Sequence, residues 1–159
     1  MKPYKIGLVI GKFYPLHNGH NYLIDTAFSL VDTLIIIICQ RPGESPNGDQ
    51  RFFWMREIYK SERIKIKLID DYFDGDDSLL WAEMTLAWCK PIINGQNIDV
   101  VCTSEKYGDN YCKYLGLLGG RRVVHHLVDL KRENVPISGT KIRSQPKESL
   151  HFLKKEVRR

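Results

Sequence analysis

The chain has 159 residues, 43% of them apolar, and a formal net charge of +5. This length suits one domain with one core, and the apolar share excludes a largely disordered chain. The longest purely apolar run, residues 34–39, is far shorter than the roughly 18 residues of a membrane span, and the N-terminus lacks the pattern of a signal peptide. We therefore expect one domain over residues 1–159 with no membrane partner.

Short, β-branched apolar runs alternate with amphipathic segments along the chain. The runs typical of buried strands are residues 5–11, 33–39, 64–70, 99–104 and 122–129. The helical patterns occupy residues 20–32, 49–62, 77–93 and 108–118. Asp49 is the expected N-cap of the second helix, and Pro91 is expected to limit the third. Continuous apolar strands separated by helices predict an α/β fold, with a doubly wound parallel sheet of about five strands.

Cysteine and charge patterns narrow the compartment and the partners. The chain has four cysteines and no C-x-x-C pair: Cys39, Cys89, Cys102 and Cys112. This pattern favours reduced thiols, a cytoplasmic location and no cysteine-based zinc site. The net positive charge suits either a phosphate site or nucleic acid. The basic clusters at residues 119–123 and 153–159 lack interleaved aromatic residues, so we predict solvated surface there and no nucleic-acid partner.

The first expected strand-to-helix turn carries two histidines in the sequence GKFYPLHNGH, residues 11–20. His17 and His20 lie where the helix begins, and a helix N-terminus offers free N–H groups and positive potential to an anion. Gly19 allows another group to approach the backbone closely, and Lys12 adds a cation. Helix capping would explain either histidine alone. The pair beside Lys12 favours a phosphate site built without a Walker loop or a G-x-G-x-x-G motif.

A second candidate anion site lies near the other end, in NVPISGTKIRSQP, residues 134–146. Ser138 and Thr140 are helix-capping residue types, and SGTKIR predicts the opening of a helix. Hydroxyls, free N–H groups, Lys141 and Arg143 would converge there, which favours a polyphosphate. An ordinary surface helix with two exposed cations fits the same residues. The combination with the histidine turn favours the polyphosphate, because ligands of doubly wound sheets bind outside the carboxyl ends of the strands.

These motifs resemble the signatures of the nucleotidyltransferase superfamily. HNGH (17–20) is similar to H-x-G-H, and ISGTKIR (137–143) is similar to I-S-x-T-x-x-R. The segments GKFYPLHNGH, TSEKYGD (103–109) and VDLKREN (128–134) look like the nicotinamide mononucleotide (NMN) adenylyltransferase domain of NadR-type proteins. The resemblance implies a Rossmann-like fold and the reaction of ATP with NMN to give NAD and pyrophosphate. The NMN phosphate would attack the α-phosphorus in line, without a covalent intermediate.

Alternatives to this reaction stay open at this point. The acceptor could instead be nicotinate mononucleotide, phosphopantetheine or a cytidylyltransferase substrate. A non-catalytic nucleotide-binding module or a nucleic-acid-binding module is a third possibility, which predicts salt-sensitive binding without turnover. The sequence does not fix the oligomeric state and is compatible with a homo-oligomer.

The resemblance also implies roles for individual residues. His17, His20, Lys12 and Arg143 would be catalytic, with the histidines holding the ATP phosphates in the transition state and Lys12 at the NMN phosphate. The implied ATP-binding residues are Gly11, Phe13, Gly19, Ile137, Ser138, Thr140 and Arg143. Magnesium would accompany the triphosphate and needs few protein ligands, so no protein metal site is expected.

Residues for the acceptor are expected around an aromatic platform. Trp81 is the candidate because tryptophan is the best platform for a cationic ring such as nicotinamide. The W-x-x-W spacing of NadR-type domains is missing here, and packing with Trp88 on a core face explains Trp81 equally well. The remaining candidates follow the fourth and fifth strands on the ligand side: Ser104, Glu105, Asp129 and Arg132.

Two further segments are assigned from their composition and position. Residues 40–51, QRPGESPNGDQR, predict a mobile surface loop, and Arg51 at its end is either close to the substrate or an exposed residue of a first helical turn. His125 and His126 are adjacent in a strand and point to opposite faces, so we expect structural roles for them.

Overall fold

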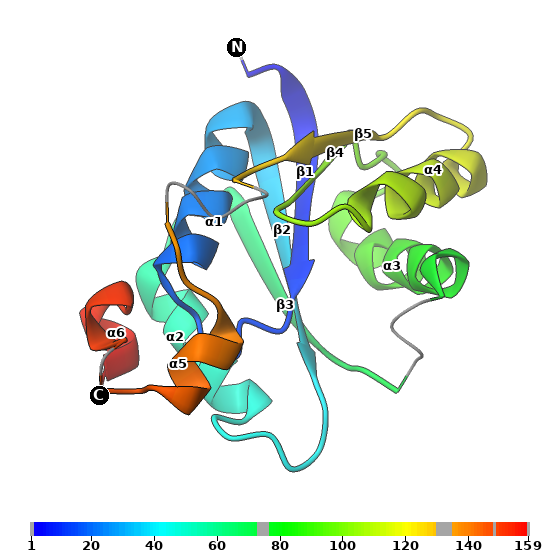
Figure 1. Cartoon of the computed structure of the whole chain (residues 1–159). Helices are drawn as coiled ribbons and strands as arrows, with labels where there is room; N and C mark the ends of the chain where they lie inside the picture. Colours follow the sequence, from blue (N-terminus) through cyan, green and yellow to red (C-terminus); the bar gives the residue numbers. More distant parts are fainter. Residues whose placement is uncertain (1, 73–76, 130–134, 148, 159) are drawn as a thin grey trace.

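Five parallel strands form one sheet in the order β3-β2-β1-β4-β5 (Figure 1). The computed structural model describes residues 2–72, 77–129, 135–147 and 149–158. The strands are β1 (Tyr4–Gly11), β2 (Val31–Gln40), β3 (Ile64–Asp70), β4 (Val100–Thr103) and β5 (Val124–Leu127). The chain winds from β1 outward to β3, then returns to place β4 on the other side of β1. The predicted doubly wound α/β fold is therefore confirmed, with its switch in strand order between β1 and β4.

Helices cover both faces of the sheet. They are α1 (Asn18–Leu30), α2 (Gly48–Ile58), α3 (Ser78–Ile93), α4 (Gly108–Gly119), α5 (Gly139–Ser144) and α6 (Lys155–Arg158), with a 3-10 turn η1 at Leu150–Phe152. In Figure 1, α1, α2, α5 and α6 lie on one side of the sheet, and α3 and α4 lie on the other. The sheet therefore separates two hydrophobic cores, and its central strands have no solvated face.

The β2 strand shows why the sheet forms. Residues 34–39 are buried without interruption, as the lack of polar alternation predicts. Ile36 and Ile38 pack into the core beneath α1 and α2, whereas Ile35 and Ile37 pack into the core beneath α3 and α4. Each buried isoleucine contributes about 1.5–3 kcal/mol of transfer free energy. This strand therefore anchors both layers of helices at once.

The start of α2 differs from the sequence prediction. Its N-cap is Asn47, whereas Asp49 was expected in that role. Asn47 Oδ1 accepts the N–H of Gln50 at 2.9 Å, and Gln50 Oε1 accepts the N–H of Asn47 at 3.0 Å. This reciprocal capping box fixes the first turn, and Asp49 lies inside it, where a carboxylate is favourable to the helix dipole.

The C-terminal basic cluster agrees with the prediction of a solvated surface in its exposed cations but not in its apolar residues. Leu153 and Val157 are buried in the core beside α2, while Lys154 and Lys155 are exposed. Pro91, expected to limit the third helix, lies inside α3, which continues to Ile93.

Within the described part of the chain, no helix combines the length and apolarity that crossing a membrane requires.

Candidate active site

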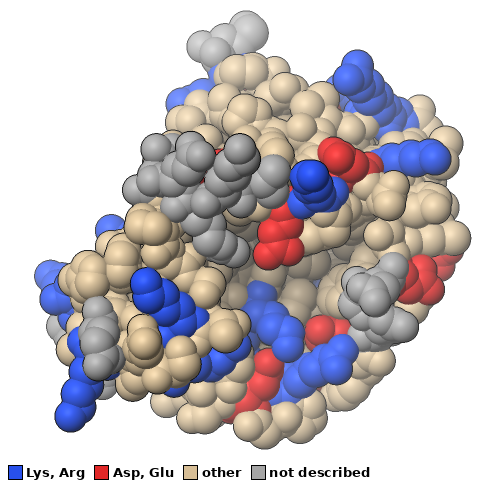
Figure 2. Space-filling view, viewed as in Figure 1, with Lys and Arg blue, Asp and Glu red and all other residues tan. Residues whose placement is uncertain are grey.

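Two adjoining cavities open at the carboxyl ends of β1 and β4, beside the switch in strand order. Figure 2 shows this face hollowed, with basic and acidic side chains together in and around the hollow. The cavities measure about 470 and 400 Å³, and we call them the histidine cavity and the tryptophan cavity. They share one wall: Ile10, Gly11, Lys12, Glu105 and Tyr107. A molecule in each cavity would therefore meet its neighbour at the end of β1.

The histidine turn closes on itself through a capping box. His17 is the N-cap of α1, and its Nδ1 atom accepts the N–H groups of Gly19 at 3.1 Å and His20 at 3.3 Å. His20 Nδ1 accepts the N–H of His17 at 3.2 Å. Because each Nδ1 accepts, each neutral ring carries its proton on Nε2. The rings stack 3.7 Å apart, and both line the histidine cavity. Capping thus uses the Nδ1 atom of each ring.

Two residues beside the histidines make this turn tight. A Cβ atom on Gly19 would lie 2.8 Å from the His17 ring, so the group that approaches the Gly19 backbone is the capping histidine. Phe13 is buried and has a φ of 51°, a left-handed conformation that costs on the order of 1 kcal/mol for a residue with a side chain. Its ring meets His20 edge-on at 4.9 Å. Phe13 therefore holds the histidine pair from the core side.

The second signature lies against the same cavity. Ser138 is the N-cap of α5, and Thr140 and Arg143 line the histidine cavity with it. The Arg143 guanidinium donates to the carbonyl oxygen of Tyr14, lies 4.4 Å from the Tyr14 ring centroid and has Nη2 3.4 Å from Thr140 Oγ1. Ile137 is buried in the core and packs next to the α1 turn rather than lining the cavity. The fold thus brings together two motifs more than a hundred residues apart.

The tryptophan cavity combines an aromatic wall with acidic groups. Trp81 lines it, and the Trp81 ring also meets Trp88 edge-on at 5.9 Å. The expected packing with Trp88 is therefore present, and the role of Trp81 as a platform for the acceptor ring stays a prediction. Asp71 is buried at the cavity wall, 3.4 Å from the Arg41 guanidinium. Burial, together with the nearby Asp71 carboxylate, raises the pKa of the Cys39 thiol in the same wall to about 12. Cys39 is therefore an uncharged thiol at neutral pH and a poor nucleophile.

The shared wall is fixed by the end of β4. Thr103 Oγ1 donates to the Glu105 carbonyl at 2.8 Å, accepts the Glu105 N–H at 3.2 Å and lies 2.6 Å from His125 Nε2. His125 Nδ1 is 2.7 Å from Asp109 Oδ1, so the predicted structural role of His125 has a geometric basis. This chain of contacts holds Ser104 and Glu105 at the ligand side of the sheet, where the sequence placed them. Glu105 lines both cavities, whereas Ser104 lines the histidine cavity, and their role as acceptor residues stays a prediction.

One predicted acceptor residue, Asp129, is placed differently, and another lies outside the described residues. Asp129 has a φ of 50°, and its Oδ2 atom accepts the N–H of Val135 at 3.0 Å. Among the described residues, Asp129 is not part of the wall of either cavity. Arg132 lies outside the described residues. The sequence therefore located the residues after the fourth strand that line the cavities. A contribution from the residues after the fifth strand stays a prediction.

Comparison with known proteins assigns this arrangement to a family. Residues 8–145 match the cytidylyltransferase-like family. This chain belongs to the cytidylyltransferase-like nucleotidyltransferases. The trifunctional NAD biosynthesis/regulator protein NadR of Escherichia coli K12 is 31% identical to this nucleotidyltransferase over 96% of the chain and 40% of its own length. The chain thus spans less than half of that relative. Phosphopantetheine adenylyltransferase of Fusobacterium nucleatum is 28% identical, covering 65% of this chain and 76% of its own.

Solved structures share the fold of this nucleotidyltransferase. A NadR protein in complex with NAD and AMP-PNP superposes with a TM-score of 0.71 at 21% identity, over 99% of this chain and 47% of that one. A bifunctional NMN adenylyltransferase/ADP ribose pyrophosphatase from Francisella tularensis, complexed with AMP and a manganese ion, gives 0.68 at 16% identity, over 96% and 44%. These likenesses confirm the predicted Rossmann-like fold.

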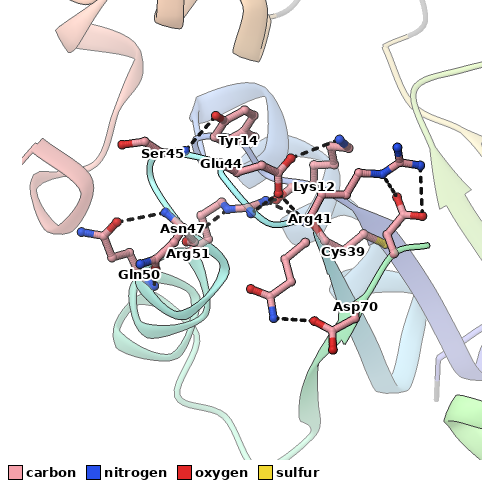
Figure 3. Close-up of polar contacts among 12 residues, drawn as sticks. Lys12, Tyr14, Cys39, Arg41, Glu44, Ser45, Asn47, Gln50, Arg51 and Asp70 are labelled. Atoms are coloured by element: carbon pink, nitrogen blue, oxygen red, sulfur yellow. Dashed lines mark hydrogen bonds and ion pairs between the residues drawn. The ribbon is translucent and has the colours of Figure 1, made fainter. Parts of the chain in front are cut away.

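Arg51 of this nucleotidyltransferase is not an exposed residue of a first helical turn. Its side chain has no exposed surface. Nη1 donates to the carbonyls of Lys12 at 2.7 Å and Cys39 at 3.2 Å, so one guanidinium ties together the carboxyl ends of β1 and β2. Nη2 lies 2.7 Å from Glu44 Oε1 (Figure 3). The sequence could not indicate this burial, because Arg51 follows a segment rich in Pro, Gly and Asn.

The segment between β2 and α2, residues 41–47, is anchored at its centre. Glu44 accepts from Lys12 Nζ, from Arg51 and from the N–H of Arg41, and the N–H of Ser45 donates to Tyr14 Oη at 2.9 Å. Partial burial would raise the pKa of Glu44, but the hydrogen bonds from these three donors lower it below the ordinary value. Glu44 is thus a carboxylate at neutral pH, and it is a neighbour of the cavity residue Lys12 that the sequence analysis did not single out.

The described residues contain no group of three or more His, Cys, Asp and Glu side chains placed as metal ligands. Glu105 is the acidic side chain among those lining the histidine cavity, and the rest of its polar wall consists of histidines, hydroxyls and cations. This donor set suits phosphates, and magnesium accompanying the triphosphate stays a prediction.

Proposed function

We propose that this chain transfers the adenylyl group of ATP to NMN, giving NAD and pyrophosphate. The observation that carries the proposal is the shared wall: a cavity containing both phosphate-binding signatures meets an aromatic cavity at Gly11 and Lys12. A triphosphate in the histidine cavity and a mononucleotide in the tryptophan cavity would have their reacting phosphates next to each other. Holding two reactants in this way removes much of the entropic barrier.

The reaction needs no enzyme nucleophile. An oxygen of the NMN 5′-phosphate attacks the α-phosphorus of ATP, and the bond from that phosphorus to the bridging oxygen of pyrophosphate breaks in line. The Nε2–H groups of His17 and His20 would donate to the phosphate oxygens, where negative charge develops. Lys12 and Arg143 would add positive charge on either side. Magnesium, bound with ATP, would supply further charge neutralisation to the phosphates.

The tryptophan cavity supports a nicotinamide rather than a nicotinate acceptor. The flat, cationic nicotinamide ring suits the face of Trp81. Asp71 and Glu105 place carboxylates in the wall of this cavity. The carboxylate of nicotinate mononucleotide would meet these two carboxylates against one ammonium, that of Lys12, whereas the neutral amide carries no charge for them to repel. We therefore expect discrimination in favour of NMN.

A second acceptor has a specific observation in its favour. The relative from Fusobacterium nucleatum is a phosphopantetheine adenylyltransferase, and it is 28% identical to this chain over 65% of its length. Phosphopantetheine would use the same attack on ATP but has no cationic ring for Trp81. The two acceptors therefore differ in how strongly they depend on that side chain.

An acceptor panel tests the proposal directly. The folded chain is incubated with magnesium and ATP, and separately with CTP, in the presence of NMN, nicotinate mononucleotide or phosphopantetheine. Pyrophosphate release and the nucleotidylated form of each acceptor are then measured. We expect fastest turnover with ATP and NMN. Product from phosphopantetheine alone would replace NMN as the acceptor, and no product from any pair would contradict an enzymatic role. Salt-sensitive RNA or DNA binding without turnover would favour the binding-module alternative.

A further inference from the structure

Lys12, the cation expected at the acceptor phosphate, forms an ion pair with the neighbouring carboxylate of Glu44. Lys12 Nζ lies 3.1 Å from Glu44 Oε2 (Figure 3). The Lys12 side chain keeps 48% of its surface exposed, whereas Glu44 keeps only 11%. An ammonium has three donor hydrogens, so Lys12 can bind Glu44 and a substrate phosphate at the same time. Glu44 therefore restricts where the Lys12 ammonium lies without blocking it.

Glu44 is itself fixed by groups that do not reach the cavities. Its Oε1 atom accepts from the buried Arg51 guanidinium at 2.7 Å and from the N–H of Arg41 at 2.7 Å. Arg51 in turn donates to the carbonyl of Lys12. Lys12 is thus held twice, through its ammonium by Glu44 and through its backbone by Arg51. Figure 3 shows Glu44 between these two basic side chains.

We propose that Glu44 is a positioning residue for the adenylyl transfer described above, and that it sets the place of the Lys12 ammonium at the shared wall of the two cavities. This inference rests on the proposed function, because it assigns Lys12 to the reacting phosphate of NMN. The carboxylate touches neither substrate. It acts through Lys12, and it leaves one net positive charge in the group formed by Glu44, Lys12 and Arg51.

The affinity for the acceptor distinguishes positioning of Lys12 from a second possible role of Glu44, competition with the substrate for Lys12. If Glu44 merely competed with the substrate for Lys12, removing its charge would tighten acceptor binding. If it positions Lys12, removing its charge weakens binding, because the flexible lysine stem then samples many rotamers. The two roles therefore predict changes of opposite sign in the KM for NMN.

The main experiment compares E44Q with the wild-type chain in NAD formation. Glutamine keeps an acceptor oxygen for Arg51 but loses the charge that holds Lys12. We expect kcat/KM for NMN to fall about 10-fold, mainly through KM, with a smaller change for ATP, since misplacement by about 1 Å costs up to roughly 100-fold. E57Q, which makes the same change at an exposed position of α2, is the matched control and should keep wild-type kinetics. A lower KM for NMN in E44Q would overturn the proposal.

A double variant separates positioning from general structure. If Glu44 acts through Lys12, then E44Q in a K12M background should lose nothing beyond K12M alone. Losses that multiply would show that Glu44 acts independently and would overturn the proposal. Thermal unfolding monitors folding of each protein. If E44Q does not fold, E44D replaces it. Aspartate keeps the charge but is one methylene too short to hold Lys12 and Arg51 together, and wild-type kinetics in E44D would equally contradict a positioning role.

Failure of the proposed function would be recognised separately. Turnover of NMN by the wild-type chain decides that question alone. Should the wild type give no NAD, the same four proteins (wild type, E44Q, K12M and the double variant) are titrated with inorganic pyrophosphate by calorimetry. The positioning role is supported if E44Q binds pyrophosphate more weakly than the wild type, and if adding E44Q to K12M does not weaken binding further. Unchanged or tighter binding in E44Q overturns it.

Discussion

The two segments that border Lys12 are held in different ways. The turn at residues 17–20 is closed by its own residues, through a capping box between His17 and His20 and the close approach at Gly19. The segment 41–47 is held at its centre by residues far along the chain, chiefly Lys12 and Tyr14. One segment of the site is therefore built by local contacts, and the other by tertiary contacts.

This difference separates what each segment contributes. A local capping box survives changes elsewhere, because its donors and acceptors lie within four residues. A segment held by buried charges depends on every partner, because an unpaired charge in the interior is costly. Variants in the histidine turn should therefore affect turnover more than stability, and variants at Arg51 should affect both.

The largest expected effect is on stability, in R51M. Methionine fills similar volume but removes the Arg51 hydrogen bonds to the carbonyls of Lys12 and Cys39 and one of the three donors to Glu44. Breaking a buried ion pair costs about 3–5 kcal/mol, which urea unfolding would measure. R56M, at an exposed position of the same helix, is the control and should change the unfolding free energy by less than about 1 kcal/mol. An R51M protein as stable as R56M would contradict the view that buried tertiary contacts hold the segment 41–47.

The next effect is on rate, in H17N. Asparagine is a good N-cap, so its side-chain oxygen can replace Nδ1 in accepting the N–H groups of Gly19 and His20. It has no counterpart of the Nε2–H group in the cavity. We expect a loss of about 100- to 1,000-fold in kcat with an unfolding free energy close to wild type. NAD formation and thermal unfolding measured on one preparation check both parts. A stable H17N protein with normal turnover would show that His17 caps the helix and has no catalytic role.

A smaller effect is expected for N47A at the end of the anchored segment. Alanine removes the side chain that caps α2 but keeps the backbone carbonyl of residue 47, which accepts from Arg51 Nε at 3.3 Å. Loss of the cap should cost about 1 kcal/mol, with little change in turnover. A large loss of turnover would mean that the local cap, and not only the buried charges, positions the segment.

The smallest effect is a pH dependence of stability at Glu44. Its folded-state pKa lies below the ordinary value of 4.5. The stability it contributes is therefore complete above the unfolded pKa and is lost as pH falls through the lower folded pKa. The difference in unfolding temperature between wild type and E44Q should be constant near neutrality and shrink in acid below about pH 4. A difference that does not narrow in acid would show that the carboxylate charge is not what stabilises this segment.

Much of the candidate site was predictable from motifs whose local structure depends on neighbouring residues. The H-x-G-H and I-S-x-T-x-x-R resemblance located His17, His20, Ser138 and Arg143, because a helix start and its capping residues are local in sequence. Glu44 and Arg51 could not be located in this way. Their segment has the composition of an exposed loop, and their partners lie up to 39 residues away.

By itself, the sequence determined the strand-helix alternation, the uninterrupted burial of β2 and the two capped turns, because periodicity and capping are properties of neighbouring residues. The tertiary structure alone decided that α5 lies against the α1 turn, that Tyr14 meets both Arg51 and Arg143, and that Lys12 is held by Glu44. These contacts join segments that only the wound sheet brings together. Charge pairing between them depends on distance and burial in the folded chain.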